Sequence, residues 1–383
     1  MTMRMHKYLF VMANEGVQWG GSEPLWSTAA EMLVRRGNEV RVSVKDWGEP
    51  VEQIEHLRAG GCKIFYRGEF PPFFYRLGRR IFPLPEYRRL HVRSAAKGVD
   101  LVVISQGANM DGLLWMEEAR AAGHSYVVIA QGAIPYWWPD DSVSERVAES
   151  YEKAKASYFV SQAILDASRR QFATPLGNAK VVRNPFNVRY EARPVWPGRT
   201  TEEMLLACVA RQEIGKGQDL ILQTLALPHW RERKIKVSLI GTGPNDRTLR
   251  RIAEQLKLAS VDFPGYSRDI EEVWSRHHAL LLASRHEGMP LSVVEAMLCG
   301  RPCIATDVGG NRELIRDGVN GFLAKAPTVE LLDEAMNRAW DARGRLKEMG
   351  CTAARDVRAW VSADPSEDFA RELMSLVDGA EGQ

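Results

Sequence analysis

The sequence has few cysteines and no long hydrophobic run. Its five cysteines among 383 residues are an odd number without the spacing of a zinc site, and we interpret them as reduced thiols. The apolar stretch Tyr8–Ala13 is too short for the core of a signal peptide, and no segment approaches the length of a transmembrane helix. The sequence therefore predicts a cytoplasmic protein without a disulfide framework or a membrane span.

The chain also lacks an excess of charge of either sign. Its formal net charge is +2, from 51 basic and 49 acidic residues, which gives no reason to expect a nucleic-acid partner. No Asp-x-Asp motif occurs, and none of the eight histidines stands at metal-ligand spacing with acidic neighbours. We therefore expect no cofactor and no essential metal ion.

Strand and helix signals alternate along most of the chain. Tyr8–Ala13 is a continuous apolar run, as expected of a strand buried on both faces, and residues 40–44 alternate like a second strand. Ser22 is predicted to cap a helix that ends at Gly37. Further strands are expected at residues 101–105, 126–130, 158–161, 180–183, 204–210, 235–240, 261–263, 279–283 and 303–306. This alternation predicts an α/β fold with parallel sheets covered on both faces.

The chain is longer than one hydrophobic core usually supports, and the alternation restarts after a proline-containing stretch. We place an N-terminal Rossmann-like domain at residues 1–190 and a linker at 191–201. A second Rossmann-like domain is expected at 202–355, and residues 356–383 form a C-terminal helix that either covers it or returns to the first domain. Because ligands bind beyond the carboxyl ends of parallel strands, two doubly wound domains that face a cleft are expected.

Residues 284–300 carry the strongest local signal. A strand is expected to end at the start of this stretch, a loop to carry Glu287 and Gly288, and a helix to begin at Pro290. The N-terminus of such a helix points free N–H groups and a partial positive charge at a bound diphosphate. We interpret Glu287 and Glu295 as acceptors for sugar and ribose hydroxyls, because carboxylates that faced the phosphates would repel them. The alternative is a capped surface helix with incidental glutamates.

This stretch resembles the two-glutamate motif of family 4 retaining glycosyltransferases of the GT-B fold. The resemblance is dense from residue 204 to 324 and sparser, but in the same order, from 8 to 190. It includes Gly20–Glu23, Asn184–Pro185, Arg211, Lys216–Gly217, Gly241–Pro244, Arg301–Ile315 and Asp317–Leu323. It implies a hexosyltransferase-like enzyme that transfers a sugar with retention from a nucleotide-diphosphate sugar to an unidentified acceptor hydroxyl. The domain at 1–190 would then bind the acceptor, and the domain at 202–355 would bind the nucleotide-sugar. UDP is slightly favoured as the nucleotide, and the reaction would belong to glycan, glycolipid or glycosylated-metabolite biosynthesis.

The resemblance also implies roles for individual residues. Arg211 and Lys216 would hold the donor diphosphate and neutralise it as it leaves. Glu295 would bind the ribose and Glu287 the transferred sugar, so that Arg211, Lys216 and Glu287 form the catalytic group. The donor site would be completed by the start of the helix and by a glycine pair that either lets the backbone approach the donor or forms a tight turn: Gly288, Met289, Pro290, Gly20 and Gly21.

Gln131 departs from the family pattern, because many relatives carry a histidine at this position close to the reacting sugar. A glutamine can contact a sugar hydroxyl but cannot act as a general base at neutral pH. Trp137 and Trp138, which follow it, are interpreted either as part of the acceptor site or as core residues. Two alternatives to a transferase remain open: an epimerase or phosphorylase on the same fold, and a non-catalytic sensor of nucleotide-sugars.

Residues 70–93 break the alternation with aromatic, proline and arginine residues. We interpret the segment either as an irregular excursion with a solvated basic face or as a surface for an anionic membrane or acceptor. Basic side chains beside exposed aromatic residues suit anionic lipid head groups. On the second interpretation the protein lies on the inner face of the cell membrane.

Overall fold

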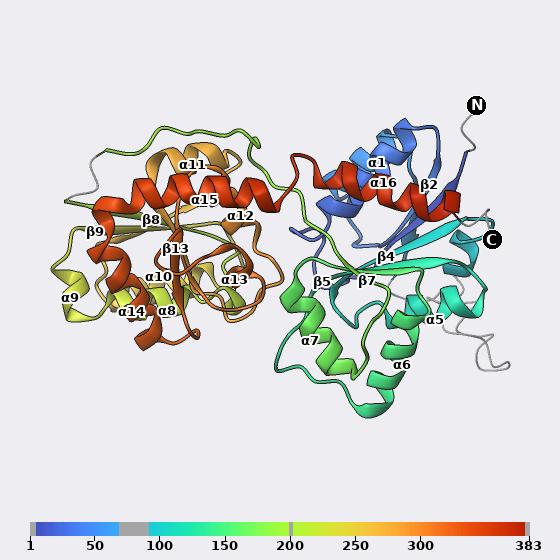
Figure 1. The fold of residues 1–383 in the computed structure, drawn as a ribbon, viewed down its shortest axis with the longest axis horizontal. Helices are drawn as coiled ribbons and strands as arrows, with labels where there is room; N and C mark the ends of the chain where they lie inside the picture. The colour runs from blue at the N-terminus through green and yellow to red at the C-terminus, as the bar shows by residue number, and fades with distance from the viewer. Residues whose placement is uncertain (1–4, 69–91, 199–201, 380–383) are drawn as a thin grey trace. The chain divides into compact units, whose positions relative to one another are not determined.

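The computed structural model describes residues 5–68, 92–198 and 202–379. They form two compact units: unit 1 contains the described chain up to Pro185 and again from Asp364, and unit 2 spans Phe186–Ala363. The sequence had suggested residues 190 and 355 for these boundaries. In Figure 1 each unit is a parallel sheet with helices on both of its faces. The chain therefore leaves unit 1, completes unit 2 and returns to unit 1 with its last helix.

Unit 1 is built on a seven-stranded parallel sheet in the order β3-β2-β1-β4-β5-β6-β7. Its strands are β1 (Lys7–Met12), β2 (Glu39–Lys45), β3 (Lys63–Arg67), β4 (Leu101–Ala108), β5 (Tyr126–Gly132), β6 (Ala156–Phe159) and β7 (Ala179–Val181). Its helices include α1 (Pro24–Arg35), α2 (Glu52–Ala59), α5 (Leu113–Ala121), α6 (Asp141–Glu152), α7 (Gln162–Phe172) and α16 (Pro365–Asp378). At the centre, Tyr8 of β1 pairs with Val40 of β2 and with Leu101 of β4.

Strand β1 is apolar along most of its length because both faces of its sheet are covered. Tyr8, Phe10 and Met12 belong to the core that includes side chains of α1 and α16. Leu9 and Val11 belong to the core on the opposite face. Successive side chains of a strand point to opposite faces, so a strand buried on both sides needs an apolar residue at every position. This explains why the first strand was identifiable from the sequence.

Unit 2 contains a six-stranded parallel sheet in the order β10-β9-β8-β11-β12-β13. Its strands are β8 (Met204–Val209), β9 (Ile235–Ile240), β10 (Val261–Gly265), β11 (Ala279–Leu282), β12 (Cys303–Thr306) and β13 (Gly321–Ala324). Its helices are α8 (Gln218–Leu225), α9 (Pro228–Arg231), α10 (Asp246–Gln255), α11 (Ile270–Arg276), α12 (Leu291–Leu298), α13 (Asn311–Leu314), α14 (Val329–Asp341) and α15 (Leu346–Trp360), with short 3-10 turns η1 (Ile214–Lys216) and η2 (Arg343–Arg345).

The predicted α/β fold with parallel sheets is confirmed, and the structure corrects two local expectations. Strands β3 and β13 were not identified from the sequence. Both lie at sheet edges and are short, so they lack a long apolar run. The predicted cap at Ser22 is wrong: α1 begins at Pro24, whose fixed φ suits the first helical turn, and the Ser22 hydroxyl instead donates to the Glu23 carboxylate.

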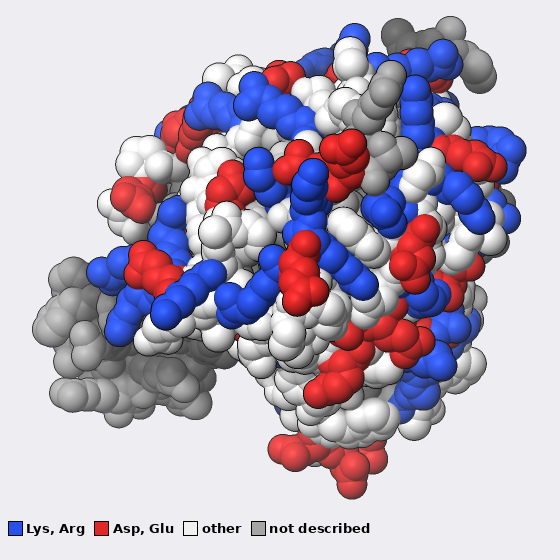
Figure 2. Space-filling model, turned by 90° about the vertical axis from the view of Figure 1, so that its left-hand side faces the viewer, with Lys and Arg blue, Asp and Glu red and all other residues white. Residues whose placement is uncertain are grey.

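Charged side chains of both signs are interspersed over the face drawn in Figure 2, in keeping with the small net charge of the chain. Within the described ranges, no helix is both long and apolar enough to cross a membrane. Apart from Val92 and Arg93, the basic aromatic segment predicted at residues 70–93 lies outside the described residues.

The C-terminal helix α16 completes the core of unit 1. It lies beside α1 in Figure 1, and Phe369 packs edge-on against Tyr158 of β6 with ring centroids 5.2 Å apart. Glu372 accepts a hydrogen bond from the Tyr158 hydroxyl at 3.0 Å and contacts Lys180 of β7. Near the other end of the helix, Glu367 forms an ion pair with Arg36. A helix from the end of the chain thus covers the first strands to be made.

Replacing Phe369 with alanine should destabilise unit 1 by about 3–5 kcal/mol, because the change removes a buried ring and leaves a cavity. Amide hydrogen exchange should accelerate in β1 and β6 and stay unchanged in β9 and β12 of unit 2. Arg371→Ala, at an exposed position of α16, is the control and should cost less than about 1 kcal/mol. Equal acceleration in both units would contradict the assignment of α16 to unit 1.

Candidate functional site

The loops that follow β8, β11 and β12 of unit 2 pack together where these parallel strands end. Gly217 follows β8, and a Cβ atom at this position would lie 1.9 Å from the carbonyl oxygen of Ala283, just after β11. Gly309 follows β12, and its Cβ would lie 2.1 Å from the carbonyl oxygen of Glu287. Both glycines have positive φ, +66° and +53°. Any side chain would therefore push these loops apart, and glycine is needed at both positions.

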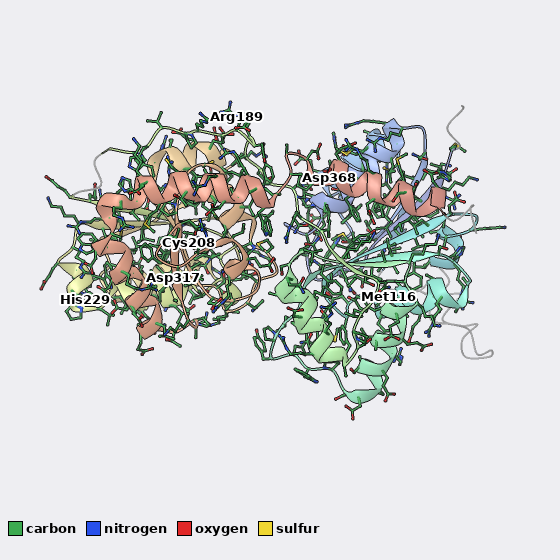
Figure 3. All side chains as sticks on the ribbon, viewed as in Figure 1. Met116, Arg189, Cys208, His229, Asp317 and Asp368 are labelled. Carbon is green, nitrogen blue, oxygen red and sulfur yellow. The ribbon has the colours of Figure 1, made fainter. Side chains whose placement is uncertain are left out.

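Lys216 and Glu287 form a buried ion pair at this junction. The Lys216 Nζ lies 2.8 Å and 3.0 Å from the two carboxylate oxygens of Glu287, which also accepts a hydrogen bond from the Ser284 hydroxyl at 2.7 Å. Burial alone would lower the pKa of Lys216, but the charge and hydrogen bonds of Glu287 outweigh it, so the pKa is raised. Burial raises the pKa of the nearby Cys208 thiol, labelled in Figure 3, to about 12. The site therefore brings the cation of Lys216 into direct contact with the carboxylate of Glu287.

Arg211, the second predicted diphosphate ligand, is oriented differently. Its side chain is half exposed, and its guanidinium Nε lies 3.4 Å from a carboxylate oxygen of Glu213. Its backbone carbonyl accepts a hydrogen bond from the Gln218 side chain at the start of α8, at 2.9 Å. The backbone of Arg211 is thus fixed by this hydrogen bond. Its side chain is more exposed than that of Lys216, at 50% against 25%.

Helix α12 follows the loop of Glu287, as the sequence predicted, but begins one residue later than expected. Pro290 has ψ of 122° and precedes the helix, whose first residue is Leu291. The loop residues Gly288 and Met289 lead into it, and the Gly288 carbonyl accepts a hydrogen bond from Gly310 N at 2.9 Å. The helix is buried from Ser292 to its end, so its first free N–H groups lie beside a packed loop and provide positive electrostatic potential there.

Glu295 lies one helical turn into α12 and is 3% exposed. A single carboxylate oxygen, Oε1, accepts two hydrogen bonds from Asn187, from the backbone N at 2.9 Å and from Nδ2 at 2.8 Å. Burial raises the pKa of Glu295, and the two hydrogen bonds from Asn187 oppose this effect. The second carboxylate of the predicted motif is therefore paired with neutral donors, whereas Glu287 is paired with a cation.

In unit 1, the predicted glycine pair belongs to a loop that a buried carboxylate holds in place. Gly20 N donates to Glu23 Oε2 at 2.8 Å, and the Ser22 hydroxyl donates to Oε1 at 2.7 Å. Burial raises the pKa of Glu23, and these hydrogen bonds partly offset the effect. Gly21 is exposed at the tip of the loop. The backbone N of Glu23 donates to the Gly20 carbonyl at 3.4 Å, so the glycine pair belongs to a tight turn, and a close approach of the donor to it stays a prediction.

Gln131 lies at the end of β5 and pairs with Asn184. The Asn184 Nδ2 donates to Gln131 Oε1 at 2.7 Å, and Gln131 Nε2 donates to Asn184 Oδ1 at 3.2 Å and to the Ser22 carbonyl at 3.1 Å. The amide that stands in place of a histidine thus joins the glycine loop to Asn184. It is buried, and its polar atoms are bonded within unit 1.

Trp137 and Trp138 are exposed by 50% and 60%, so the alternative that they are core residues is wrong. They lie with the still more exposed Tyr136 on the loop between β5 and α6. The buried Gln171 of α7 fixes this loop by donating to the carbonyl oxygens of Ile134 at 2.8 Å and of Trp137 at 3.3 Å. The aromatic rings therefore project into solvent from a backbone that is held in place.

Sequence reasoning gave no role to three residues that contact the predicted site residues. Lys216 and Glu287 are brought into direct contact, and Glu295 lies on the helix that follows. The structure adds partners to which no role had been given: Ser284, Asn187 and Glu23. Only Glu23 had a sequence signal, since it closes the glycine motif that the resemblance quoted. Among the described residues, no three His, Cys, Asp or Glu side chains are grouped as metal ligands.

Comparison with known proteins finds a glycosyl transferase family model and relatives that are named synthases. Residues 193–356 match the model of the family described as glycosyl transferases group 1. The chain is 33% identical over 120 residues to the N-acetyl-alpha-D-glucosaminyl L-malate synthase of Bacillus anthracis, covering 29% of this chain and 32% of that protein. It is 28% identical over 209 residues to a glycogen synthase of Pseudomonas savastanoi pv. phaseolicola, covering 51% and 40%. The matches thus span two fifths or less of the length of these relatives.

Solved structures cover nearly the whole chain. The Anabaena protein Alr3699/HepE, crystallised in complex with UDP-glucose, is 20% identical with a TM-score of 0.74, over 96% of this chain and 99% of that one. The sucrose-phosphate synthase of Thermosynechococcus elongatus is 17% identical with a TM-score of 0.73, over 98% and 100%. The GT-B fold, with its two Rossmann-like units, is therefore confirmed for this chain.

Gly309→Ala should disturb the loop of Glu287, because the new methyl group would meet a backbone carbonyl that cannot move without the loop. Gly318→Ala is a matched control: its φ is also positive, at +74°, but nothing lies within 4 Å of the added Cβ. Both should lose about 1 kcal/mol to the left-handed backbone, and Gly309→Ala at least about 1–3 kcal/mol more to overpacking. Thermal unfolding of both variants measures the difference, and equal losses would contradict this packing.

Proposed function

We propose that the chain is a glycosyltransferase that moves a sugar from a nucleotide-diphosphate sugar to an acceptor hydroxyl. The observation that carries this proposal is the Lys216–Glu287 pair in the loops before α12, within the segment that matches the glycosyl transferases group 1 family. A screen of UDP-, GDP- and ADP-sugars for a rise in melting temperature tests it, because a ligand that binds the native state stabilises it. No shift with any of them would overturn the proposal.

The chemistry of such a transfer requires charge at two places, and unit 2 offers both. Negative charge develops on the departing diphosphate, where Lys216, Arg211 and the N-terminus of α12 supply positive charge. Positive charge develops on the sugar, where the Glu287 carboxylate accepts hydrogen bonds from hydroxyl groups. On donor binding, Lys216 would exchange part of its contact with Glu287 for a phosphate oxygen. Without donor, the two charges neutralise each other. With donor bound, Lys216 would act on the diphosphate and Glu287 on the sugar.

The finer assignments are part of the same proposal. Retention of configuration and membership of family 4 follow from the two-glutamate resemblance. UDP is the favoured nucleotide, supported by the complex of the structurally similar Anabaena protein with UDP-glucose. The acceptor would be bound by unit 1, through the exposed faces of Trp137 and Trp138 and the loop braced by Gln131. Contact of residues 70–93 with an anionic membrane, which would place the protein peripherally on the inner face of the cell membrane, stays a prediction.

The alternative enzymes and the sensor are not favoured by these comparisons. An epimerase would change the donor alone, a phosphorylase would use free phosphate, and a sensor would bind without turnover. Product analysis with donor in the presence and absence of candidate acceptors separates all three from a transferase.

Transfer should survive chelation. Lys216 and Arg211 together with the α12 terminus would neutralise the leaving diphosphate, a task that a divalent ion performs in other enzymes. Turnover measured with excess EDTA should equal turnover without it. A loss with EDTA that Mg²⁺ or Mn²⁺ restores would contradict metal-independent transfer.

Glu287→Gln and Glu295→Gln should have opposite effects on binding and turnover. Glu287→Gln leaves Lys216 without its counter-charge, so free UDP should bind at least as tightly, while turnover falls ten-fold or more with the loss of a charged hydrogen bond worth about 1.5–3 kcal/mol. Glu295→Gln should weaken the binding of UDP about ten-fold or more, because this carboxylate is assigned to the ribose.

Calorimetry with UDP and steady-state kinetics on both variants measure these effects, with thermal unfolding as the check on folding. The reverse pattern, in which Glu287→Gln abolishes nucleotide binding and Glu295→Gln only slows turnover, would show that the two assignments are interchanged.

A further inference from the structure

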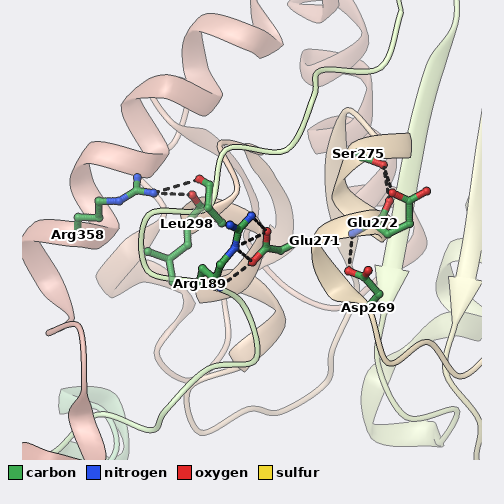
Figure 4. A network of polar contacts seen from close by, with 8 residues as sticks. Arg189, Asp269, Glu271, Glu272, Ser275, Leu298 and Arg358 are labelled. Atoms are coloured by element: carbon green, nitrogen blue, oxygen red, sulfur yellow. Dashed lines mark hydrogen bonds and ion pairs between the residues drawn. The ribbon is translucent and has the colours of Figure 1, made fainter.

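Residues 186–197, which we call the strap, run along unit 2 without regular secondary structure and are held by the largely buried Arg358 and by an ion pair of the exposed Arg189. Arg358 of α15 donates to the Leu298 carbonyl at the end of α12 at 2.9 Å, and to the strap carbonyls of Tyr190 at 3.0 Å and Ala192 at 3.3 Å. Figure 4 shows this guanidinium between the strap and α12. The strap is therefore fixed to the same helix that carries Glu295.

A second anchor lies two residues after Asn187. The Arg189 guanidinium makes a two-point ion pair with Glu271 of α11, at 2.6 Å between Nη2 and Oε2 and 3.0 Å between Nε and Oε1. The backbone N of Arg189 also donates to Glu271 Oε1 at 2.8 Å. Fixed on its C-terminal side, the strap presents Asn187 to α12 with its backbone N–H and its carboxamide directed at one atom.

That atom is Oε1 of Glu295, and the arrangement is asymmetric. Both donors of Asn187 bind Oε1, and among the described residues no hydrogen bond reaches Oε2. An ionised carboxylate can accept several hydrogen bonds through each oxygen, so Oε2 retains its capacity for a ligand. Two bonds to one oxygen also fix the rotation of the carboxylate, since turning it would break both.

We propose that Asn187 is a positioning residue of the donor site: it holds Glu295 through Oε1 and so presents Oε2 to the ribose hydroxyls of the nucleotide. The inference rests on the proposed function, and it makes the strap part of the nucleotide site. A carboxylate in this buried position would otherwise favour its neutral form, which accepts hydroxyl donors less well. Asn187 thus orients Glu295, and its hydrogen bonds favour the ionised form against the effect of burial.

The surroundings of Glu295 contain few groups that could imitate this effect. Charged groups near the Cys299 thiol, which follows the last residue of α12, are Glu295, Glu271 of α11, Arg301 and Arg358. Burial raises the pKa of that thiol to about 12, and the guanidinium groups stay charged at any working pH. Apart from Glu295 and Glu271, whose pKa is lowered by its pair with Arg189, no described member of this set titrates in mildly acidic solution.

Asn187→Ala and the equally sized Asn187→Asp test the proposal by calorimetric titration with UDP over a range of pH. Asn187→Ala should weaken UDP roughly ten-fold at neutral pH. Because a hydrogen bond to the ionised form is lost, the pKa of Glu295 should rise and the loss of binding in acid should begin at higher pH than in the wild type. Asn187→Asp, which adds a negative charge beside Oε1, should weaken UDP binding further than Asn187→Ala does. In a Glu295→Gln background, Asn187→Ala should have little further effect.

Arg189→Ala is the matched control, because it loosens the strap at the Glu271 anchor without touching Glu295. It should leave UDP affinity within a few-fold of the wild type and should not move the pH profile. If Arg189→Ala and Asn187→Ala weaken UDP equally with an unchanged pH profile, Asn187 is only a structural tether and the inference is overturned. If the wild type binds no UDP, GDP or ADP, the proposed function itself fails, a result distinct from binding that does not depend on Asn187.

Discussion

The site in unit 2 depends on a close approach of backbones that only glycine permits. Gly217 touches the carbonyl of Ala283, and Gly309 touches the carbonyl of Glu287. These contacts bring the turn of Lys216 against the loop of Glu287, so that a cation and a carboxylate meet at 2.8 Å in a largely buried place. Breaking such a pair leaves a buried charge unpaired, which is costly, and each partner therefore keeps the other in position. Two glycines thus fix the electrostatics of the site.

The two glutamates of the motif have different electrostatic environments although they lie eight positions apart. Glu287 faces the Lys216 cation and accepts a further hydrogen bond from the Ser284 hydroxyl. Glu295 faces only the N–H groups of Asn187, and its burial works against its charge. The position of Glu287 is therefore determined by an ion pair, and that of Glu295 by two hydrogen bonds from neutral donors. This division agrees with roles at opposite ends of a donor, one beside the reacting sugar and one at the ribose.

The sequence predicted what is local or repetitive. Strand β1 was identifiable because a strand buried on both faces is apolar throughout, and Lys216, Glu287 and Glu295 because their motif is dense around them. The contact between Asn187 and Glu295 spans 108 residues of sequence, and no pattern in the neighbourhood of either residue indicates it. Ser22 was misread as a cap since the fixed φ of Pro24 outweighs its preference. Exposure of Trp137 was also beyond the sequence, because an aromatic run fits a core equally well.

The return of α16 to unit 1 bears on synthesis of the chain. Strand β1 and helix α1 are made well before α16, so the apolar surface that Phe369 and Leu373 cover stays open until α16 has been made. At about 5–20 residues per second, the roughly 180 residues of unit 2 take on the order of 10–35 s to make. Unit 2 can form its own sheet in that interval, while the apolar surface of unit 1 that α16 later covers remains exposed. A chain in which α16 has not yet been made therefore exposes an apolar surface of the kind that chaperones bind, and the formation of α16 covers it.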